Sequence, residues 1–321
     1  MSQQEPTQIS AENAAARVES VAALMADPDA RVRKSCVVAL GKMDAPGAAA
    51  QLARALDDAD EGVRVLACQA LGRKTGEELA GVLPALVAHV HDASGQVRSG
   101  VLWALANAVA HAGLDADTLA GLFTPVTVLA FDPDDGVRAD AAAVLGTLRD
   151  ERATDALTVL LEDEVARVRA NACASLGLTD DEAGEALLLA RVAQAGEDAL
   201  VRVSAVDALA RRCERDDAPH ARVLPGLLAC CADEDADVAS TAVWALGFAC
   251  EQASELRGQV QGALSQALAG ANEWAARYAV ESLAHIHDDA ARQLLDGFDP
   301  STSTYCDALA PLVTQALATF E

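Results

Sequence analysis

The chain of 321 residues has few aromatic and few basic residues. Phe, Trp and Tyr make up 3% of it, and 24 Lys and Arg stand against 49 Asp and Glu, which gives a formal net charge of −25. Proteins that bind the phosphate backbone of nucleic acids carry a basic face, so this balance argues against a nucleic-acid partner. The sequence also lacks an uncharged apolar run of about 18 residues, and its first residues lack the basic and apolar regions of a signal peptide. We therefore expect a cytoplasmic protein without a membrane partner.

The eight cysteines form no C-x-x-C pair, and most of them lie in alanine-rich segments. A thiol in such a segment acts as a small apolar side chain, so we expect reduced cysteines in the core. A zinc site or a disulfide that uses Cys230 and Cys231 with Cys213 or Cys250 stays open as an alternative. Because 52% of the residues are apolar but few are aromatic, the composition favours closely packed helices with small side chains.

A pattern of turn and helix recurs along the chain. Its copies are DPDARVRKSCVVALG (27–41), DDADEGVRVLACQALG (57–72), HDASGQVRSGVLWALA (91–106), DPDDGVRADAAAVLG (132–146), DEVARVRANACASLG (163–177), EDALVRVSAVDALA (197–210) and ADEDADVASTAVWALG (232–247). Aligned on the Val-Arg pair, the reference residues are Arg33, Arg64, Arg98, Arg138, Arg169, Arg202, Ala239 and, in a degenerate copy, Arg277. The distance from Arg33 to Arg138 and from Arg64 to Arg169 is 105 residues in both cases, which indicates an old duplication of three repeats.

Each copy predicts two helices. An apolar run is followed by an Asp-rich turn, which supplies an N-cap, and by a second helix that ends near a glycine. Counting the arginine as position 0, apolar residues hold positions −1, +3 and +6 or +7, which lie on one helical face. Pairs of this kind bury both faces only when stacked. The sequence therefore predicts an all-α fold, a right-handed α-solenoid of about eight to nine antiparallel helix pairs. We expect one domain over 1–321, with a flexible terminus (1–10), repeats (12–290) and capping helices (291–321).

The Asp-x₅-Arg spacing, together with V-R-x-x-A and A-L-G, resembles HEAT repeats, in particular the short HEAT-like variety named after the phycobilisome lyases. In that family the turn aspartate and the helix arginine form a ladder between neighbouring repeats. The resemblance assigns this structural role to Asp27, Arg33, Asp58, Arg64, Asp92, Arg98, Asp132, Arg138, Asp163 and Arg169. Gly196 stands opposite Arg202, and Ala239 follows Asp233 where an arginine is expected. We expect the ladder to end in these repeats.

Related HEAT-like proteins have activities that require particular residues. Deoxyhypusine hydroxylases bind a di-iron centre through His-Glu dipeptides, and none of the six histidines here precedes a glutamate. The HEAT-like DNA glycosylases use a basic concave face, which a chain with three lysines does not resemble. Two H-x-H-D segments (89–92 and 285–288) leave a metal site open, but histidines two apart do not share a helical face. A bilin-lyase-like enzyme or a cofactor-handling chaperone remains the alternative function.

Positions +1, +5 and +9 of the second helices lie opposite the core. The resemblance to HEAT repeats implies that this stripe lines the concave face. This stripe holds a basic group in the first repeats (Lys34, Lys42, Arg73), a floor of alanines (139, 143, 170, 174) and Trp103 with Asn107. Near the C-terminus, Trp244 and Phe248 are four residues apart, and Trp274 and Tyr278 repeat that spacing. Exposed Trp and Tyr are frequent binding hot spots. The alternatives are that the lysines are scattered surface charges and that the capping helices bury the aromatics.

The leading hypothesis is a non-catalytic scaffold or adaptor that binds a protein, peptide or helix on its concave face. We expect no cofactor, no metal and no small-molecule ligand. Trp103 and Trp244 occupy the same +5 position, so we expect an extended segment of about 20 residues, about 30 Å as a helix, to contact both. The acidity fits either a salt-rich cytoplasm or a genome rich in G and C.

Overall fold

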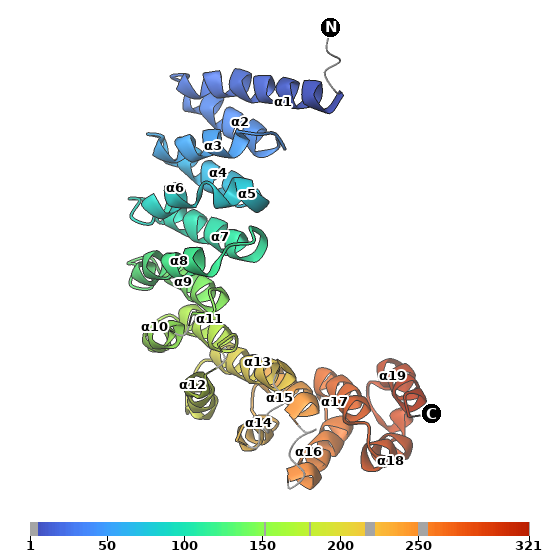
Figure 1. Ribbon diagram of the computed structural model, residues 1–321. Coiled ribbons are helices and arrows are strands. Elements are labelled where there is room, and N and C mark those ends of the chain that lie inside the picture. The colour runs from blue at the N-terminus through green and yellow to red at the C-terminus, as the bar shows by residue number, and fades with distance from the viewer. Residues whose placement is uncertain (1–5, 151, 180, 216–221, 250–255, 321) are drawn as a thin grey trace. The chain divides into compact units, whose positions relative to one another are not determined.

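The computed structural model describes residues 6–150, 152–179, 181–215, 222–249 and 256–320 (Figure 1). Within these ranges every regular element is a helix and no strand occurs. This confirms the predicted all-α solenoid. None of the described helices is long and apolar enough to cross a membrane.

The chain divides into two compact units, residues 1–156 (unit 1) and 157–321 (unit 2). Unit 1 contains α1 (Pro6–Ala22), α2 (Ala30–Gly41), α3 (Ala48–Arg54), α4 (Glu61–Leu71), α5 (Gly76–Ala80), α6 (Leu83–Ala88), α7 (Gly95–His111), α8 (Ala116–Leu129) and α9 (Asp135–Thr147), with short 3-10 turns η1 (Ala23–Ala26) and η2 (Ala55–Asp57). Residues 6–10, which the sequence analysis assigns to a flexible terminus, belong to α1. Residues 1–5 lie outside the described ranges.

The boundary between the units falls within α10 (Ala153–Leu160). Unit 2 continues with α11 (Ala166–Leu176), α12 (Glu182–Ala193), α13 (Ala199–Arg215), α14 (Leu224–Cys230), α15 (Ala236–Ala249), α16 (Arg257–Ala269), α17 (Glu273–Ile286), α18 (Asp289–Gly297), η5 (Pro300–Thr302) and α19 (Cys306–Ala318). Helices α18 and α19 pack against α17, at the place where the sequence predicts capping helices.

Two aspartates in the turn start the second helix in several repeats, as before α4 and α9. The Oδ1 atoms of Asp58 and Asp132 accept the backbone N–H two residues later, at 2.8 and 2.9 Å. The following acceptors, Asp60 and Asp134, receive the N–H of Val63 and Val137 and act as N-caps. Because an N-cap satisfies an N–H that the helix leaves unpaired, the Asp-x-Asp turn fixes where α4 and α9 begin.

The core follows the predicted period. Position −1 is a fully buried valine in six repeats, at Val63, Val97, Val137, Val168, Val201 and Val238. Position +7 is a fully buried leucine at Leu71, Leu105, Leu145, Leu176, Leu209 and Leu246. Burying such a side chain contributes about 1.5–3 kcal/mol, so the stack depends on these two positions in the six repeats.

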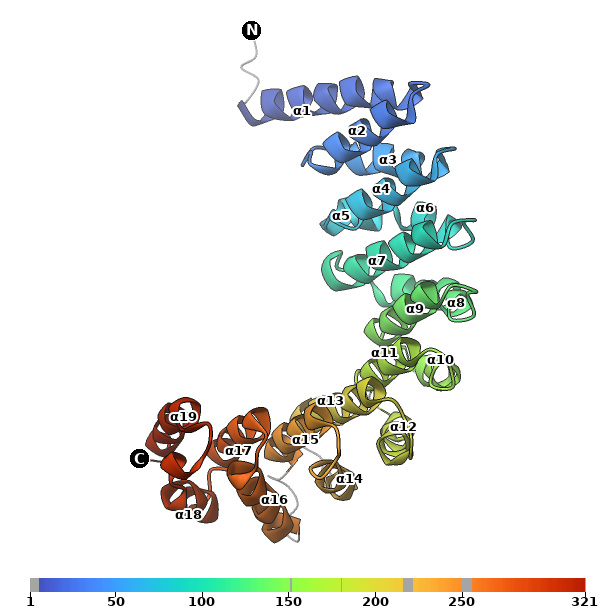
Figure 2. The same cartoon turned by 180° about the vertical axis from the view of Figure 1, so that it is seen from behind.

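The second helices form a layer of their own in each unit, which we call the inner layer (Figures 1 and 2). In unit 1 it consists of α2, α4, α7 and α9, and in unit 2 of α11, α13, α15 and α17. Neighbours in this layer pack directly on one another, whereas successive first helices such as α12, α14 and α16 touch at few points. The more closely spaced layer is the inner side of a curved stack, so each unit presents the inner layer on its concave face.

Ion pairs join neighbouring repeats within each unit. Their shortest N–O distances are 2.7 Å for Arg33–Asp58, 2.8 Å for Arg64–Asp92, 2.6 Å for Arg98–Asp132, 2.7 Å for Arg169–Glu197 and 2.8 Å for Arg202–Asp233. Each arginine therefore pairs with the carboxylate of the following repeat. With the aspartate six residues before it, the arginine shares only a backbone contact: Arg98 Nη1 donates to the carbonyl of Asp92 at 2.7 Å.

The ladder does not stop at Gly196. Glu197, one residue later, accepts from Arg169, and its longer side chain compensates for the shifted position. Arg202 then pairs with Asp233. Position 239 is alanine and carries no guanidinium, so the series ends there. Arg138 and Asp163 lie in different units; within unit 1, Arg138 Nη1 donates to the carbonyl of Asp132 at 2.9 Å.

The ladder changes the protonation behaviour of its carboxyl groups. Hydrogen bonds from Arg33 lower the pKa of Asp58 below its usual range. At Asp132 burial alone would raise the pKa, but the hydrogen bonds from Arg98 and from the N–H of Asp134 outweigh it and lower the pKa. The ladder carboxyl groups are therefore ionised at neutral pH.

Candidate functional site

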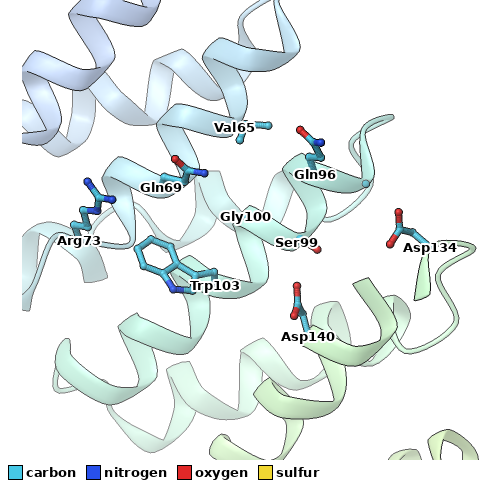
Figure 3. Close-up of a pocket in the computed structure, with 10 residues that line it drawn as sticks. Val65, Gln69, Arg73, Gln96, Ser99, Gly100, Trp103, Asp134 and Asp140 are labelled. Atoms are coloured by element: carbon cyan, nitrogen blue, oxygen red, sulfur yellow. The ribbon is translucent and has the colours of Figure 1, made fainter. Parts of the chain in front are cut away.

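A groove with a volume of about 590 Å³ crosses the inner layer of unit 1 (Figure 3). We call it groove 1. Side chains and backbone of α4, α7 and α9, with the turn before α9, line it: Val65, Gln69, Arg73, Gly95, Gln96, Ser99, Gly100, Trp103, Asp134 and Asp140. Five of these residues hold the predicted +1, +5 and +9 positions: Val65, Gln69, Arg73, Ser99 and Trp103.

Trp103 is the exposed aromatic residue of groove 1. Its exposed fraction is 42%. The ring lies against Gly72, where an added Cβ would come within 2.2 Å of Cζ3 and 2.4 Å of Cε3. Only glycine at position 72 leaves room for this ring position. The backbone of α4 therefore holds a large apolar side chain at the surface of the groove.

Groove 1 has opposite charges at its two ends. Figure 3 shows Arg73 on one side of Trp103 and Asp134 and Asp140 on the other. The carboxylate of Asp134 is held in place because its Oδ1 accepts the N–H of Val137 at 3.2 Å. The side chains of Gln69 and Gln96 add amide donors and acceptors. The groove can thus contact a ligand that has an apolar part and charged groups of both signs.

The predicted basic residues are not gathered at one place. Lys34 and Lys42 are eight residues apart on and just after α2, which corresponds to about 12 Å along a helix. Lys34 Nζ lies 2.9 Å from Asp60 Oδ1. Lys42 is exposed, and Arg73 lines groove 1. Asn107 turns back on its own helix, where its Nδ2 donates to the carbonyl of Trp103 at 2.8 Å.

A second groove, groove 2, crosses the inner layer of unit 2 and has a volume of about 490 Å³. Helices α13, α15 and α17, with the turn before α15, line it through Ala199, Leu200, Val203, Asp235, Asp237, Ser240, Thr241, Trp274 and Tyr278. Trp274 and Leu200 are 54% and 51% exposed. Within their units, grooves 1 and 2 lie over corresponding helices of the inner layer.

The four C-terminal aromatics form two separate pairs. Trp274 and Tyr278 line groove 2, with ring centroids 6.1 Å apart. Trp244 and Phe248 contact each other edge to face at 4.9 Å, and Phe248 also meets the ring of His285 at 5.1 Å. Trp244 and Phe248 are half-buried and are not among the residues that line groove 2. The capping helices therefore do not bury Trp244 or Trp274 fully.

The predicted alanine floor is only partly at the surface. Ala143 and Ala174 are exposed, but Ala139 and Ala170 are buried, with exposed fractions of 0% and 4%. The prediction of a continuous floor is therefore wrong. It treats each helix alone, whereas close packing within the inner layer covers the +1 position when that residue is small.

The acidic members of both grooves were not predicted from the sequence. Asp134 and Asp235 are N-caps in the turns, Asp237 is in the first turn of α15, and Asp140 is at position +2 of α9. None of these positions is on the predicted stripe. A search for N-cap aspartates beside an aromatic position of the neighbouring repeat would have found Asp134 and Asp235.

In the described part of the chain, the histidines and cysteines are not arranged as a metal site. No group of three or more His, Cys, Asp and Glu residues is placed there to hold a metal ion. Burial raises the pKa of Cys68 and Cys173 to about 12, so both thiols stay protonated. Cys230 is buried and Cys231 half-buried, and both are free thiols; Cys250 lies outside the described residues.

Comparisons with known proteins fit this geometry. The family model for HEAT repeats matches residues 18–106 and 125–210. The sequence matches none of the curated proteins.

Solved structures agree in fold. An engineered protein from the Northeast Structural Genomics Consortium is 20% identical, with a TM-score of 0.54 over 99% of this chain and 92% of that one. YibA of Escherichia coli is 14% identical, with a TM-score of 0.57 over 89% and 95%. A chain in the structure of Kap95p bound to RanGDP is 14% identical, with a TM-score of 0.67 over 94% of this chain and 45% of that one. At these identities the likeness concerns the fold alone.

Proposed function

We propose, from the premise that this chain belongs to the HEAT-repeat family, that it is a non-catalytic scaffold or adaptor that binds a segment of a partner protein on its inner layer. We also propose that its repeats are of the short variety named after the phycobilisome lyases and that the protein is cytoplasmic. The proposal also includes the expectation that nucleic acids and small molecules are not the ligand.

The observation that carries this proposal is the position of Trp103 in groove 1. A tryptophan buries a large area on binding, and interface hot spots are rich in this residue. Trp103 is 42% exposed, but its ring is already held by its contact with Gly72. Little side-chain entropy is lost when a ligand covers a ring that is already held, so the contact favours binding.

The extent of groove 1 supports a protein segment as the ligand. The groove crosses three neighbouring helices of the inner layer. Packed helices are about 8–10 Å apart, so three of them span about 16–20 Å. That length corresponds to about five or six extended residues. The polar residues Gln69, Gln96 and Ser99 can pair with the backbone of such a segment.

In unit 2 we propose that Trp274 and Tyr278 make the main contacts with the partner, and that Trp244 and Phe248 make further ones. Trp103 belongs to unit 1 and Trp244 to unit 2. The expectation that a single segment contacts both tryptophans stays a prediction.

The proposed function is tested by capture of partners from the native lysate on the tagged full-length protein. Trp103→Ala should weaken binding of the partner about 30-fold, since truncating a hot spot costs about 2 kcal/mol and each 1.4 kcal/mol is tenfold. Phe131→Ala is the matched control, because Phe131 is 65% exposed in the same unit and does not line groove 1. Equal capture by both variants would contradict the proposal. A change in absorption on mixing with a linear tetrapyrrole would instead support the bilin-handling alternative.

A further inference from the structure

We infer that groove 2 binds a lysine- or arginine-containing segment of a partner protein, with the alkyl part of the basic side chain on Trp274 and Leu200 and its charged group at Asp235 and Asp237. This inference rests on the proposed function, because it names the chemistry of the segment that the scaffold holds in unit 2.

The apolar wall of groove 2 fits the stem of a long side chain. Leu200 and Trp274 come from the first turns of α13 and α17, and about half of each side chain is exposed. Tyr278, one turn further along α17, extends this wall. Lysine and arginine cover apolar surface with their methylene groups while the charged group stays at the edge.

The charged lining of groove 2 has one sign. Among the described residues that line it, Asp235 and Asp237 are the charged ones, and none is basic. The Oδ1 atom of Asp235 accepts the N–H of Asp237 at 3.0 Å and of Val238 at 3.2 Å. The carboxylate of Asp235 is thus held in a fixed orientation at the start of α15. Groove 1 differs, because Arg73 is part of its lining.

The neutral polar groups of α15 also favour a ligand that only donates hydrogen bonds. Ser240 Oγ donates to the carbonyl of Asp237 at 3.2 Å, and Thr241 Oγ1 donates to the same carbonyl at 2.7 Å. Each hydroxyl has one hydrogen, so both oxygens present only lone pairs to the groove. Lysine and arginine side chains are donors without an acceptor. An acidic ligand would meet the two carboxylates and these lone pairs.

The ring of Trp274 already contacts one guanidinium of its own helix. Arg277 Cζ lies 5.0 Å from the ring centroid, and Arg277 Nη1 lies 3.5 Å from Glu273 Oε1. This distance is within the range of cation–π attraction, which is about 6 Å. Trp274 stays 54% exposed beside Arg277, so a basic side chain of a partner can also reach it.

The test uses Trp274 as the only reporter. The chain has three tryptophans, so the Trp103→Phe, Trp244→Phe double variant keeps Trp274 alone. It is titrated with acetyl-Ala-Leu-Lys-Ala-Leu-Lys-Ala-Leu-Lys-amide and, separately, with the same peptide carrying Glu in place of Lys. We expect a saturable change in Trp274 emission with the lysine peptide and none with the glutamate peptide.

A matched pair of charge variants separates groove 2 from the overall charge of the protein. The double variant Asp235→Asn, Asp237→Asn keeps the N-cap, since Asn caps as well as Asp. Its affinity for the lysine peptide should be at least tenfold lower than that of the parent. The control is Asp115→Asn, Asp117→Asn, which changes the same two positions, N-cap and first turn, at the start of α8. The control should bind as the parent does.

Calorimetry on the otherwise unchanged chain gives a second readout. Trp274→Ala should lose binding of the lysine peptide, with thermal unfolding followed to show that the variant is folded. Equal affinities of the two Asn double variants would show attraction by net charge alone, and the inference would be wrong. If the lysine peptide gives no saturable change while Trp103-dependent capture persists, groove 2 is misassigned but the scaffold function stands. If neither the saturable change with the lysine peptide nor the Trp103-dependent capture is seen, both proposals are wrong.

Discussion

Gly72 shows how a single missing Cβ shapes a binding surface. Its backbone is covered by the ring of Trp103 and approached by Ala104 Cα, which would lie 3.1 Å from an added Cβ. Gly72→Ala should force the ring away and destabilise the fold by about 1–3 kcal/mol, as overpacking does. Urea unfolding measures the stability, and capture of the partner should weaken although Trp103 is still present. Unchanged capture would show that the position of the ring has no part in binding.

Gly262 is the matched residue for this test. It lies within α16, is exposed, and an added Cβ would meet nothing within 4 Å. Gly262→Ala should raise the free energy of unfolding by about 0.5–1 kcal/mol, because glycine is a poor helix former. The same urea measurement serves here, and a loss of stability would contradict the expectation.

At the scale of elements, the ladder fixes one repeat to the next. Asp132 has a side chain only 5% exposed, and Arg98 is its ion-pair partner. Arg98→Ala leaves this carboxylate buried without its partner, so we expect a loss of about 3–5 kcal/mol. Arg31→Ala is the control, since the side chain of Arg31 is itself 89% exposed in its ion pair with Asp29. Ion pairs between exposed side chains add little to stability, so we expect a small effect. Similar effects of both substitutions would contradict a structural role for the ladder.

The ladder also determines how stability depends on pH. The folded chain lowers the pKa of Asp58 and Asp132, so the unfolded chain binds protons at a higher pH than the folded chain. Stability from these groups is complete above the ordinary carboxyl pKa of about 4 and is lost as the pH falls through the lowered values. Burial raises the pKa of Asp132, and without the hydrogen bonds from Arg98 less remains to oppose it, so the pKa is lowered less in the variant. The difference in unfolding free energy between the wild type and Arg98→Ala should therefore narrow below about pH 4.5. A difference that stays constant with pH would contradict this.

The sequence predicts the positions that a single helix buries or exposes. It does not predict the contacts that form only when two helices pack together. Position −1 is buried because its period is a property of α4 or α7 alone, so Val63 and Val97 could be assigned to the core. The partner of Arg98 is Asp132 rather than Asp92, because the carboxylate of Asp92 pairs with Arg64 and leaves Arg98 only the carbonyl of that residue. Glu197 takes the role of the turn aspartate but lies one residue after the expected position. An alignment that requires the acid to lie six residues before the arginine does not detect it.

The same limit applies to the grooves. Trp103 and Arg73 were predicted at the surface because their position on the helix is enough to expose them. Asp134 and Asp235 join the grooves through the stagger between neighbouring helices, which the sequence does not encode locally. Trp244 and Trp274 were predicted as one site, but they hold different positions within their repeats and only Trp274 lines groove 2.

At the scale of the whole molecule, the net charge of −25 opposes folding. Like charges repel more strongly in the compact state, and salt screens them: the screening length falls from about 30 Å at 0.01 M to about 3 Å at 1 M. The ladder pairs are mostly buried and are screened less. We expect the melting temperature to rise by a few degrees between these salt concentrations, measured by differential scanning calorimetry. A fall would mean that attraction between surface ion pairs outweighs the repulsion.

The ladder has a direction along the chain. Each arginine pairs with a carboxylate that lies later in the sequence, by 25 residues for Arg33, 28 for Arg64 and 34 for Arg98. A ribosome therefore makes every guanidinium before its partner, and a newly emerged repeat waits for the following turn to be translated. Within each unit the nascent protein gains its stability one repeat behind its synthesis, and the final pair of the series closes only when Asp233 has left the exit tunnel.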